Sequence, residues 1–301
     1  GVIFYVMLAL RQALRDASWF NAKDNPAPNM AQFLDLVALG TVADVVPLDH
    51  NNRILVAQGL KRIRAGQCRP GVQALIEVAK RDVRYLQASD LGFAVGPRLN
   101  AAGRLDDMSY GIECLLAETD DKARIQAREL DTLNIERRAI EEDMQRQALE
   151  VLEQFGRLEG ESDLPKGLCL MDSTWHQGVI GILAGRLKEK YHRPVIAFAK
   201  VREDELKGSA RSISGLNIRD VLAEVDAKHP EVITKFGGHA MAAGLSLHPQ
   251  QFNRFKAAFT DVVNHALRDN ALTGEIFTDG PLDYTWLNLD FASCLQDAGP
   301  F

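Results

Sequence analysis

Apolar residues in the first part of the chain follow a helical spacing. Over about residues 1–118 they recur every three or four positions, which is the period of an amphipathic helix. Prolines lie between the clearest of these segments, which cover residues 2–14, 30–39, 53–64 and 72–78. This pattern predicts a first lobe that is mostly helical.

A long charged segment follows, and residues 120–155 contain neither Gly nor Pro. Apolar residues fall three, four or seven positions apart within it: Leu130, Leu133, Ile140, Met144, Val151 and Phe155. The spacing predicts one amphipathic helix, roughly 50 Å long if unbroken. A coiled-coil segment is the alternative, but the apolar seam is short and irregular. A connector between two lobes fits the pattern better.

The pattern changes again after the linker "GRLEGESDLPKG". Short apolar runs bounded by breakers predict strands at "GLCLMD", "RPVIAFAK", "KGSARSI" and "HAMAAGLSL". Helical patterns lie between and after them, at "QGVIGILAGRLKEKY", "NIRDVLAEVDAKHP" and "PQQFNRFKAAFTDVVNHAL". The first strand, helix and strand form a βαβ unit. The predicted fold class is therefore α/β: a helical first lobe, a long connecting helix, and a second lobe with a βαβ-containing sheet and flanking helices.

Composition and charge narrow the class of protein. A chain of 301 residues with 46% hydrophobic content is long enough for about two domains. Four cysteines show no CxxC or zinc-like spacing, so we expect a reducing compartment and no disulfide framework. The net charge of -6 argues against a chain coated by nucleic acid.

The charge is nevertheless uneven along the chain. Residues 53–104 hold ten basic residues against three acidic ones, whereas residues 105–163 hold seventeen acidic against seven basic. Two interpretations stay open, namely a face that meets a polyanion and an ordinary solvated helix surface.

Three segments of the second lobe place small residues beside a polar group: "DSTWHQGVIG", "GSARS" and "FGGHAMAAG". In an α/β sheet, ligands bind where strand ends and helix N-termini gather. Arginine offers a forked donor suited to phosphate oxygens, and glycines let backbone amides approach an anion. We therefore predict a phosphate cradle from His176, Gly208, Ser209, Arg211, Ser212, Gly237, Gly238 and His239. The alternatives are a turn with a satisfied histidine at "GGH" and close helix packing at "GVIGILAG".

The first lobe offers a second set of candidates. Asp44 lies among apolar residues in "GTVADVVPL", where burial would be costly unless a cation or strong donors met the carboxylate. Metal ligation and an N-cap or turn role both remain open for Asp44. "GPRLNAAGRL" supplies Arg98, Asn100 and Arg104 as candidate substrate contacts, with a salt bridge to a nearby aspartate as the alternative for Arg104. There is no HExxH, no DxD and no pair of adjacent histidines, so no complete metal site is visible.

Five segments, in their order and spacing, resemble the RecJ exonucleases, a family of the DHH phosphoesterase superfamily: "ALGTVADVVPL", "GPRLNAAGR", "WHQGVIGILAGRL", "GSARS" and "GGHAMAAG". "GGHxxAAG" is similar to the DHHA1 signature, and "GTVADVVPL" to the last DHH motif. The resemblance implies the C-terminal part of a DHH catalytic domain over 1–118, a connecting helix over 119–156 and a DHHA1 substrate-binding domain over 157–280. Residues 281–301 would begin the segment that leads to an OB-fold.

The same resemblance implies an activity. It is the 5'-to-3' hydrolysis of single-stranded DNA to mononucleotides in repair and recombination, with two Mn²⁺ or Mg²⁺ ions. It also implies a metal-binding and catalytic role for Asp44, a catalytic phosphate contact for His239, and substrate contacts for the other candidates. The family's aspartate-rich first motifs and its Asp-His-His triplet are absent, so we expect an incomplete metal site and a chain that is inactive alone. Ala210 stands where relatives often carry Gly.

Two other functions stay open. One is a DHH–DHHA1 oligoribonuclease or nucleotide phosphatase, and the other is a nucleic-acid-binding or editing-like module. Activity on long single strands against dinucleotides would separate the two enzymes. Expected partners are single-stranded DNA, a single-strand-binding protein and a helicase, and we expect a cytoplasmic monomer without membrane attachment. The facing surfaces of the two lobes are expected to carry Asp44 on one side and Arg211 with His239 on the other.

Overall fold

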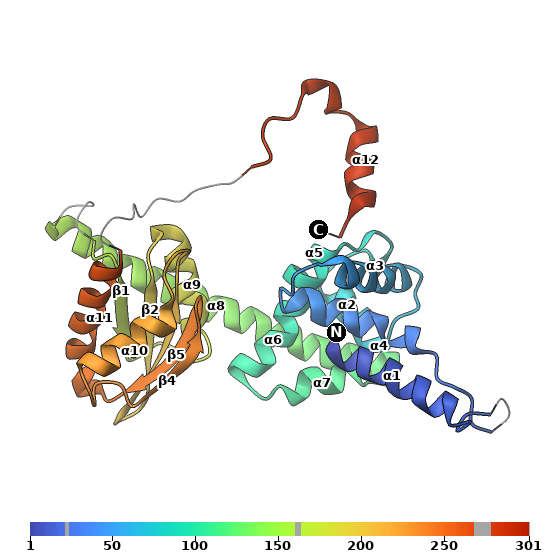
Figure 1. Ribbon diagram of the computed structural model, residues 1–301, viewed down its shortest axis with the longest axis horizontal. Coiled ribbons are helices and arrows are strands. Elements are labelled where there is room, and N and C mark those ends of the chain that lie inside the picture. Colours follow the sequence, from blue (N-terminus) through green and yellow to red (C-terminus); the bar gives the residue numbers. More distant parts are fainter. Residues whose placement is uncertain (22–23, 160–163, 268–277, 301) are drawn as a thin grey trace. The chain divides into compact units, whose positions relative to one another are not determined.

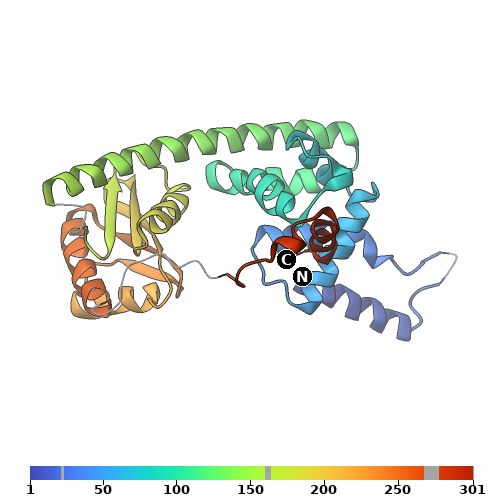
Figure 2. The same cartoon turned by 90° about the horizontal axis from the view of Figure 1, so that it is seen from above.

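The computed structural model describes residues 1–21, 24–159, 164–267 and 278–300 (Figure 1). It divides into two compact units, which we describe separately. Unit 1 comprises Gly1–Glu136 and Asp279–Phe301, and unit 2 comprises Arg137–Thr278. The predicted long helix is present as α8, Asp120–Glu159, which is continuous in Figure 2 and contributes residues to both units.

Unit 1 is built from helices, as its apolar spacing predicts. Its α-helices are α1 Val2–Asp16, α2 Leu34–Ala43, α3 His50–Arg64, α4 Pro70–Val78, α5 Ala88–Asp90, α6 Gly96–Leu105, α7 Ser109–Leu115, the first part of α8, and α12 Leu289–Ala298. Short helical turns lie at η1 Met30–Phe33, η2 Val83–Tyr85, η3 Leu91–Val95 and η6 Tyr284–Trp286. The main core of the unit is apolar and includes Val56, Leu60, Ile63, Leu75, Leu91 and Leu130.

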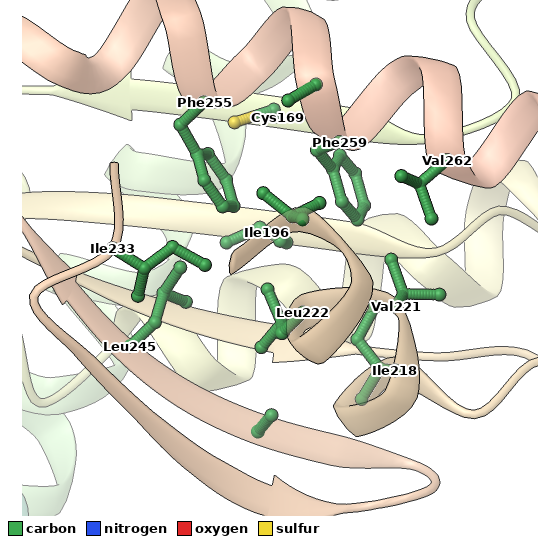
Figure 3. Close-up of a cluster of buried hydrophobic side chains, with 14 of the residues drawn as sticks. Cys169, Ile196, Ile218, Val221, Leu222, Ile233, Leu245, Phe255, Phe259 and Val262 are labelled. Carbon is green, nitrogen blue, oxygen red and sulfur yellow. The ribbon is translucent and has the colours of Figure 1, made fainter. Parts of the chain in front are cut away.

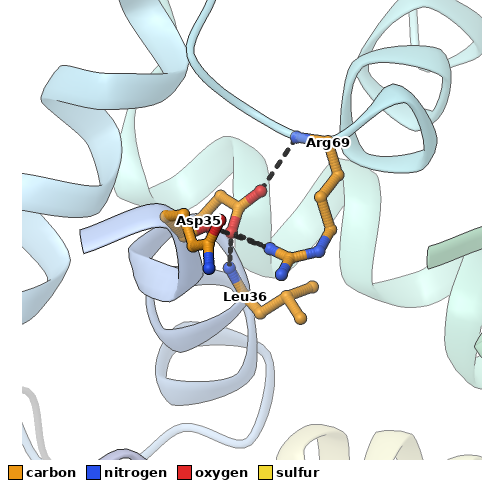
Figure 4. Close-up of polar contacts among 4 residues, drawn as sticks. Asp35, Leu36 and Arg69 are labelled. Carbon is orange, nitrogen blue, oxygen red and sulfur yellow. Dashed lines mark hydrogen bonds and ion pairs between the residues drawn. The ribbon is translucent and has the colours of Figure 1, made fainter. Parts of the chain in front are cut away.

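One buried ion pair fixes the start of α4 onto α2 (Figure 4). The Asp35 side chain is 1% exposed, and its carboxylate accepts hydrogen bonds from Arg69 Nη1 (2.5 Å), Arg69 N (2.9 Å) and Leu36 N (2.8 Å). Because a buried carboxylate is costly unless cations and donors surround it, these three bonds are what allow Asp35 to be inside. Arg69 therefore serves the fold.

Unit 2 contains a five-stranded sheet of order β1-β2-β3-β5-β4. The strands are β1 Leu168–Asp172, β2 Val195–Arg202, β3 Glu205–Arg211, β4 Lys235–His239 and β5 Ala242–Leu247. The helices are α9 Ile180–Tyr191, α10 Ile218–Lys228 and α11 Phe252–Ala266, with the turn η5 at Pro249–Gln251. β1 and β2 pair in parallel and are joined through α9, which is the predicted βαβ unit; the other pairs are antiparallel.

The two faces of this sheet differ. One face packs with α10 and α11 around a large apolar core that includes Ile196, Leu222, Leu245, Phe255 and Phe259 (Figure 3). On the other face α9 packs against β2 and β3. The exposed residues of β4 and β5, among them Lys235, Gly237, His239 and Gly244, lie beyond that cover.

The segment "FGGHAMAAGLSL" requires a correction. The sequence predicts one strand beginning at the histidine, with the two glycines in a turn before it. In the structure Gly237 and Gly238 lie inside β4, the turn is at 240–241, and β5 follows, so the segment is a hairpin at the sheet edge. Strand pairing with β5 outweighs the turn preference of the glycines.

A search of the described residues finds no helix that combines the length and the apolar character needed to cross a membrane.

Candidate phosphate-binding site

The face of the unit 2 sheet that turns away from α10 and α11 carries an ordered set of polar and small residues. Side chains alternate between the two faces of a strand. Leu206 and Ala210 of β3 point into the core, so Lys207, Ser209 and Arg211 point to the opposite face. The same alternation places the even-numbered residues of β5 and the odd-numbered residues of β4 on that face.

Strand register aligns these residues into three rows across β4, β5 and β3. The rows are Lys235, Ser246 and Lys207; then Gly237, Gly244 and Ser209; then His239, Ala242 and Arg211. The first and third rows have basic residues at both ends. The middle row has no side chain larger than a serine. We call this middle row the glycine floor.

A cavity of about 380 Å³ opens over the glycine floor and the lysine row. Besides the residues of these two rows, Gln177 and Ile180 line it from the start of α9. Lys207 is held in place there, because its Nζ donates a hydrogen bond to Gln177 Oε1 (3.1 Å). The cavity lies next to the row that contains Arg211 and His239.

The glycines of this region are present for different reasons. A Cβ on Gly208 would lie 2.5 Å from Phe198 Cε1, and a Cβ on Gly238, whose φ is +149°, would lie 2.4 Å from the Ala242 carbonyl oxygen. Those two glycines are required by the fold. A Cβ on Gly237 would meet nothing within 4 Å, and one on Gly244 would only reach the Gly208 oxygen at 4.0 Å. The floor glycines therefore leave room that the protein itself does not use, as expected where a ligand approaches the backbone.

Arg211 lies over β3 with its guanidinium turned back along the strand. Its Nη1 donates to Ser209 Oγ (3.1 Å) and to the Ala210 carbonyl (2.8 Å). Gly181 of α9 makes this position possible, because a Cβ there would lie 2.8 Å from Arg211 Nη2 and 3.0 Å from Ser209 Oγ. At Gly181 the helix glycine thus accommodates an arginine head group.

The two candidate histidines differ in position. His239 is exposed at the end of β4, and its Nδ1 accepts a bond from Met241 N (3.4 Å). In a neutral ring with that tautomer, Nε2 carries the proton and can donate to an anion. His176 precedes α9, where its Nδ1 accepts from Gly178 N (3.1 Å) and its carbonyl accepts from Val179 and Ile180. His176 therefore organises the start of α9, next to Gln177 in the cavity wall.

Ser212 requires a correction. The sequence predicts its hydroxyl as a substrate contact, but the residue is 1% exposed and its Oγ donates to the Leu216 carbonyl (2.7 Å). Its backbone N–H also bonds the Met241 carbonyl (3.0 Å). Position 212 comes just after β3 ends, so the chain has already turned inward and the hydroxyl stabilises the following loop.

Asp44 is exposed, and it caps the C-terminal end of α2 through its backbone N–H to the Gly40 carbonyl (3.2 Å). The two valines that follow Asp44 are exposed, Val45 at 86%, whereas Val42 before it is partly buried and packs against the core of unit 1. Within the described part of the chain, no three His, Cys, Asp or Glu residues come together as a metal site. One carboxylate does not fit a centre for two ions, so the described residues do not form one.

Arg98 is held inside unit 1, with 12% of its side chain exposed. Its Nε donates to Asp131 Oδ1 (2.8 Å), and its Nη1 and Nη2 donate to the Ala94 and Val78 carbonyls at 2.6 and 3.5 Å. This is a structural role that the sequence did not predict, and the geometry gives no support to a phosphate contact. Asn100 and Arg104 are exposed on the same helix, α6.

Ion pairs within unit 1 also involve four of the ten basic residues in the stretch 53–104. These are Arg69, Arg81, Arg84 and Arg98. Arg81 and Arg84 pair with Asp90 and Asp82, which the net charge of +7 already includes. Of the four, Arg69 and Arg98 pair with acids outside the stretch, Asp35 and Asp131, and these two pairs reduce the positive charge that the stretch offers to a polyanion.

Sequence reasoning missed several residues of the candidate site, among them Gln177, Lys207, Lys235 and Gly244. The alternation in "KGSAR" could have placed Lys207 on the same face as Ser209 and Arg211. Lys235 and Gly244 join them only through the pairing of β4 with β5 and of β5 with β3, which the sequence does not specify.

Comparison with protein families identifies a DHHA1 domain over residues 165–265, which contains all three rows. Among curated proteins, the chain is 55% identical to the single-stranded-DNA-specific exonuclease RecJ of Salmonella typhimurium and 56% identical to that of Escherichia coli. Both matches cover the whole chain and 52% of the relative. RecJ of Bacillus subtilis is 34% identical over 82% of this chain and 29% of its own length. The chain thus spans about half the length of its more similar curated relatives.

Solved structures give the same result for the fold. RecJ from Thermus thermophilus, in complex with Mg²⁺, matches with a TM-score of 0.68 and 32% identity over 81% of this chain and 35% of that one. The complex with Mn²⁺ has the same TM-score. An exonuclease RecJ bound to manganese matches with a TM-score of 0.65 and 31% identity over 83% of this chain and 59% of that one.

Proposed function

This chain belongs to the RecJ family, and from that membership we propose that its protein is a single-stranded-DNA-specific exonuclease acting 5' to 3'. It hydrolyses phosphodiester bonds and releases mononucleotides, in DNA repair and recombination. The support is the identity of 55–56% over the entire chain to two proteins named for that activity. The curated relatives compared above are all named RecJ, which favours this function over the oligoribonuclease, phosphatase or binding-module alternatives.

The observation that carries the proposal within this chain is the three-row face of unit 2. A phosphate of the strand lies against the row of His239, Ala242 and Arg211. Arg211 supplies a planar fork of N–H donors, and His239 supplies one N–H from Nε2. The glycine floor beside them lets the sugar-phosphate backbone approach the sheet without meeting a side chain.

In this proposal unit 2 binds and orients a phosphate of the strand, and the phosphodiester bond is hydrolysed at the metal site rather than by unit 2. His239 and Arg211 neutralise charge on the phosphate and fix its position, which is the part of phosphoryl chemistry that positioning and electrostatics supply. When bound, Mn²⁺ or Mg²⁺ ions would activate water and stabilise the leaving oxygen. Asp44 is the proposed ligand in this chain, and by itself it is insufficient.

Narrower expectations accompany the proposal. They are the domain assignment over 1–118, 119–156, 157–280 and 281–301, partnership with a single-strand-binding protein and a helicase, a monomeric state, and a cytoplasmic location. The DHHA1 match over 165–265 supports the third range. The remaining expectations stay predictions.

The experiment uses the protein expressed from the complete reading frame that contains this sequence. End-labelled oligo(dT) of several lengths is incubated with Mn²⁺, and the products are separated by size. Release of mononucleotides from long single strands, with duplex DNA resistant, is the expected result. Cleavage of dinucleotides alone would instead support the oligoribonuclease, and no cleavage of any substrate would support the binding module.

A further inference from the structure

The lysine row lies at the far end of the glycine floor from Arg211 and His239. Lys207 and Arg211 are four residues apart on β3, a separation of about 13 Å along the strand. Lys235 and His239 are likewise four apart on β4. The glycine floor therefore has two basic residues at each end, one on β3 and one on β4.

The cavity extends toward the lysine end. Its lining includes Lys207, Lys235, Ser246 and the glycine floor, and it does not include Arg211 or His239. Lys207 Nζ is oriented into this wall by Gln177, whereas Arg211 Nη1 bonds Ser209 and the Ala210 carbonyl. The two β3 cations thus serve different ends of the face.

Glu205 is an acidic neighbour of the lysine row. It accepts a hydrogen bond from Ser246 Oγ (3.0 Å). With two lysines and one carboxylate, this end keeps a net positive charge. That charge suits a single phosphodiester, which carries one negative charge.

We propose that Lys207 and Lys235 form a second phosphate subsite, separate from the Arg211 and His239 pair and connected to it by the glycine floor. The inference rests on the proposed function, because it takes the ligand to be a single strand. Unit 2 then holds the strand through two phosphates, with the intervening sugar-phosphate backbone over Gly237 and Gly244. It consequently binds an oligonucleotide more tightly than a mononucleotide.

The test compares two ligands and two double variants of the 301-residue chain. The ligands are 5'-phosphorylated oligo(dT) of four nucleotides and dTMP, titrated calorimetrically over a range of salt concentrations. Lys207→Ala with Lys235→Ala should weaken oligonucleotide binding about tenfold. The slope of log K against log salt concentration should become shallower by about 0.7, as expected for the loss of one phosphate contact. The same variant should bind dTMP within twofold of the unmodified chain. Arg211→Ala with His239→Ala should weaken the binding of both ligands.

Matched controls separate a local effect from a change in total charge or folding. Lys228→Ala removes an exposed lysine that pairs with Glu224 on α10, away from this face, and should change neither titration. Lys207→Arg with Lys235→Arg keeps the charges and should retain oligonucleotide binding. Glu205→Gln removes the acidic neighbour and should strengthen oligonucleotide binding while leaving dTMP unchanged. Thermal melts of every variant report folding.

The outcomes distinguish the inference from the proposed function. The second subsite is wrong if the double lysine variant lowers the affinities for dTMP and for the oligonucleotide equally, or lowers neither affinity. Either outcome leaves the proposed phosphate site of Arg211 and His239 untouched. If the Arg211 and His239 variant leaves both ligands unaffected, the phosphate site of the proposed function is wrong.

Discussion

At the residue scale, the two adjacent glycines of "GGH" have separate causes and should respond differently to the same substitution. Gly238→Ala introduces a Cβ 2.4 Å from the Ala242 oxygen at a φ of +149°, so the free energy of unfolding should fall by about 3 kcal/mol. Gly237→Ala meets no atom within 4 Å and should change it by less than about 0.5 kcal/mol.

Gly237→Ala should weaken ligand binding although it leaves stability nearly unchanged. Its new methyl group would occupy the glycine floor, so affinity for a four-nucleotide single strand should fall about tenfold in a protein of unchanged stability. Urea unfolding and calorimetric titration measure the two quantities. A stable Gly237→Ala protein that binds normally would show that the floor is not used by a ligand.

Arg98 and Arg104 form a second contrast between neighbours on one helix. Arg98→Ala removes the partner of Asp131 and three hydrogen bonds from a site that is 12% exposed, so unfolding should become easier by about 2 kcal/mol. Arg104→Ala, at an exposed position, should leave the melting temperature nearly unchanged and weaken DNA binding at low salt more than at high salt. Equal losses at both salt concentrations would count against a phosphate contact by Arg104.

The thiols of Cys114 and Cys169, which are buried, and of Cys68, which is partly buried, should be unreactive. Burial raises the pKa of Cys68 and Cys114 to about 11 and that of Cys169 to about 12, whereas Cys294 is exposed. Because the thiolate is the reactive form, iodoacetamide at pH 8 should modify Cys294 and spare the other three in the folded protein. Mass spectrometry of tryptic peptides identifies the modified positions.

The same three thiols predict how stability depends on pH. Each has a folded-state pKa above the ordinary value of 9.0, so the folded protein binds more protons than the unfolded chain in alkaline solution. Their contribution to the free energy of unfolding is complete below pH 9, and it is lost as the pH rises toward 11 and beyond. Urea unfolding at a series of alkaline pH values measures this loss.

At the scale of elements, Gly181 in α9 should control the position of Arg211 on the neighbouring strand. The Cβ of Gly181→Ala would lie 2.8 Å from Arg211 Nη2, the far end of a flexible side chain, so the protein should fold while the guanidinium moves. Affinity for dTMP should fall about tenfold, as measured by calorimetric titration.

Gly185 offers a matched control on the same helix. A Cβ there meets nothing within 4 Å, so Gly185→Ala should raise helix stability by up to about 1 kcal/mol and leave binding unchanged. If both substitutions weaken binding to the same degree, the effect comes from α9 as a whole and the specific role of Gly181 is wrong.

Elements with a long or repeated pattern were predictable from the sequence. The uninterrupted apolar spacing over 120–155 became α8, and the strand–helix–strand pattern after Gly167 became β1, α9 and β2. Helix α6 was harder to recognise, because Pro97 and two glycines lie within Gly96–Leu105. A proline in the first turn costs no hydrogen bond, so the helix forms despite it.

The candidate site was predictable only in part, and the reason is strand register. Residue types and small neighbours pointed to Arg211 and His239 from the sequence. Their shared row exists because Arg211 pairs with Ala242 and Ala242 with His239 across the sheet. The apolar alternation excludes a shift of one residue, but a shift of two would keep both side chains on the same face and place them in different rows, and no local pattern excludes that shift.

At the scale of the whole molecule, the chain combines the three-row face, which we propose binds phosphate, with one proposed metal ligand, Asp44. Unit 2 has its own core of buried residues from α10, α11 and the sheet. The three-row face is therefore held in place by this core and does not need a bound metal ion to be ordered. The described residues bring no three metal-binding side chains together, and Asp44 is the one proposed ligand. Binding and hydrolysis should therefore be separable in this protein.

We predict that the 301-residue chain binds single-stranded DNA without cleaving it. Two-metal hydrolysis needs several carboxylate or imidazole ligands to hold two ions about 4 Å apart, and one aspartate does not supply them. The purified chain is incubated with labelled oligo(dT) and Mn²⁺ beside the protein from the complete reading frame, and dTMP is titrated into it separately. Release of mononucleotides by the chain would reveal a metal site that the described residues do not contain. Binding of dTMP that persists after Arg211→Ala with His239→Ala would place the phosphate away from the three-row face, because those two side chains supply the donors at its phosphate end.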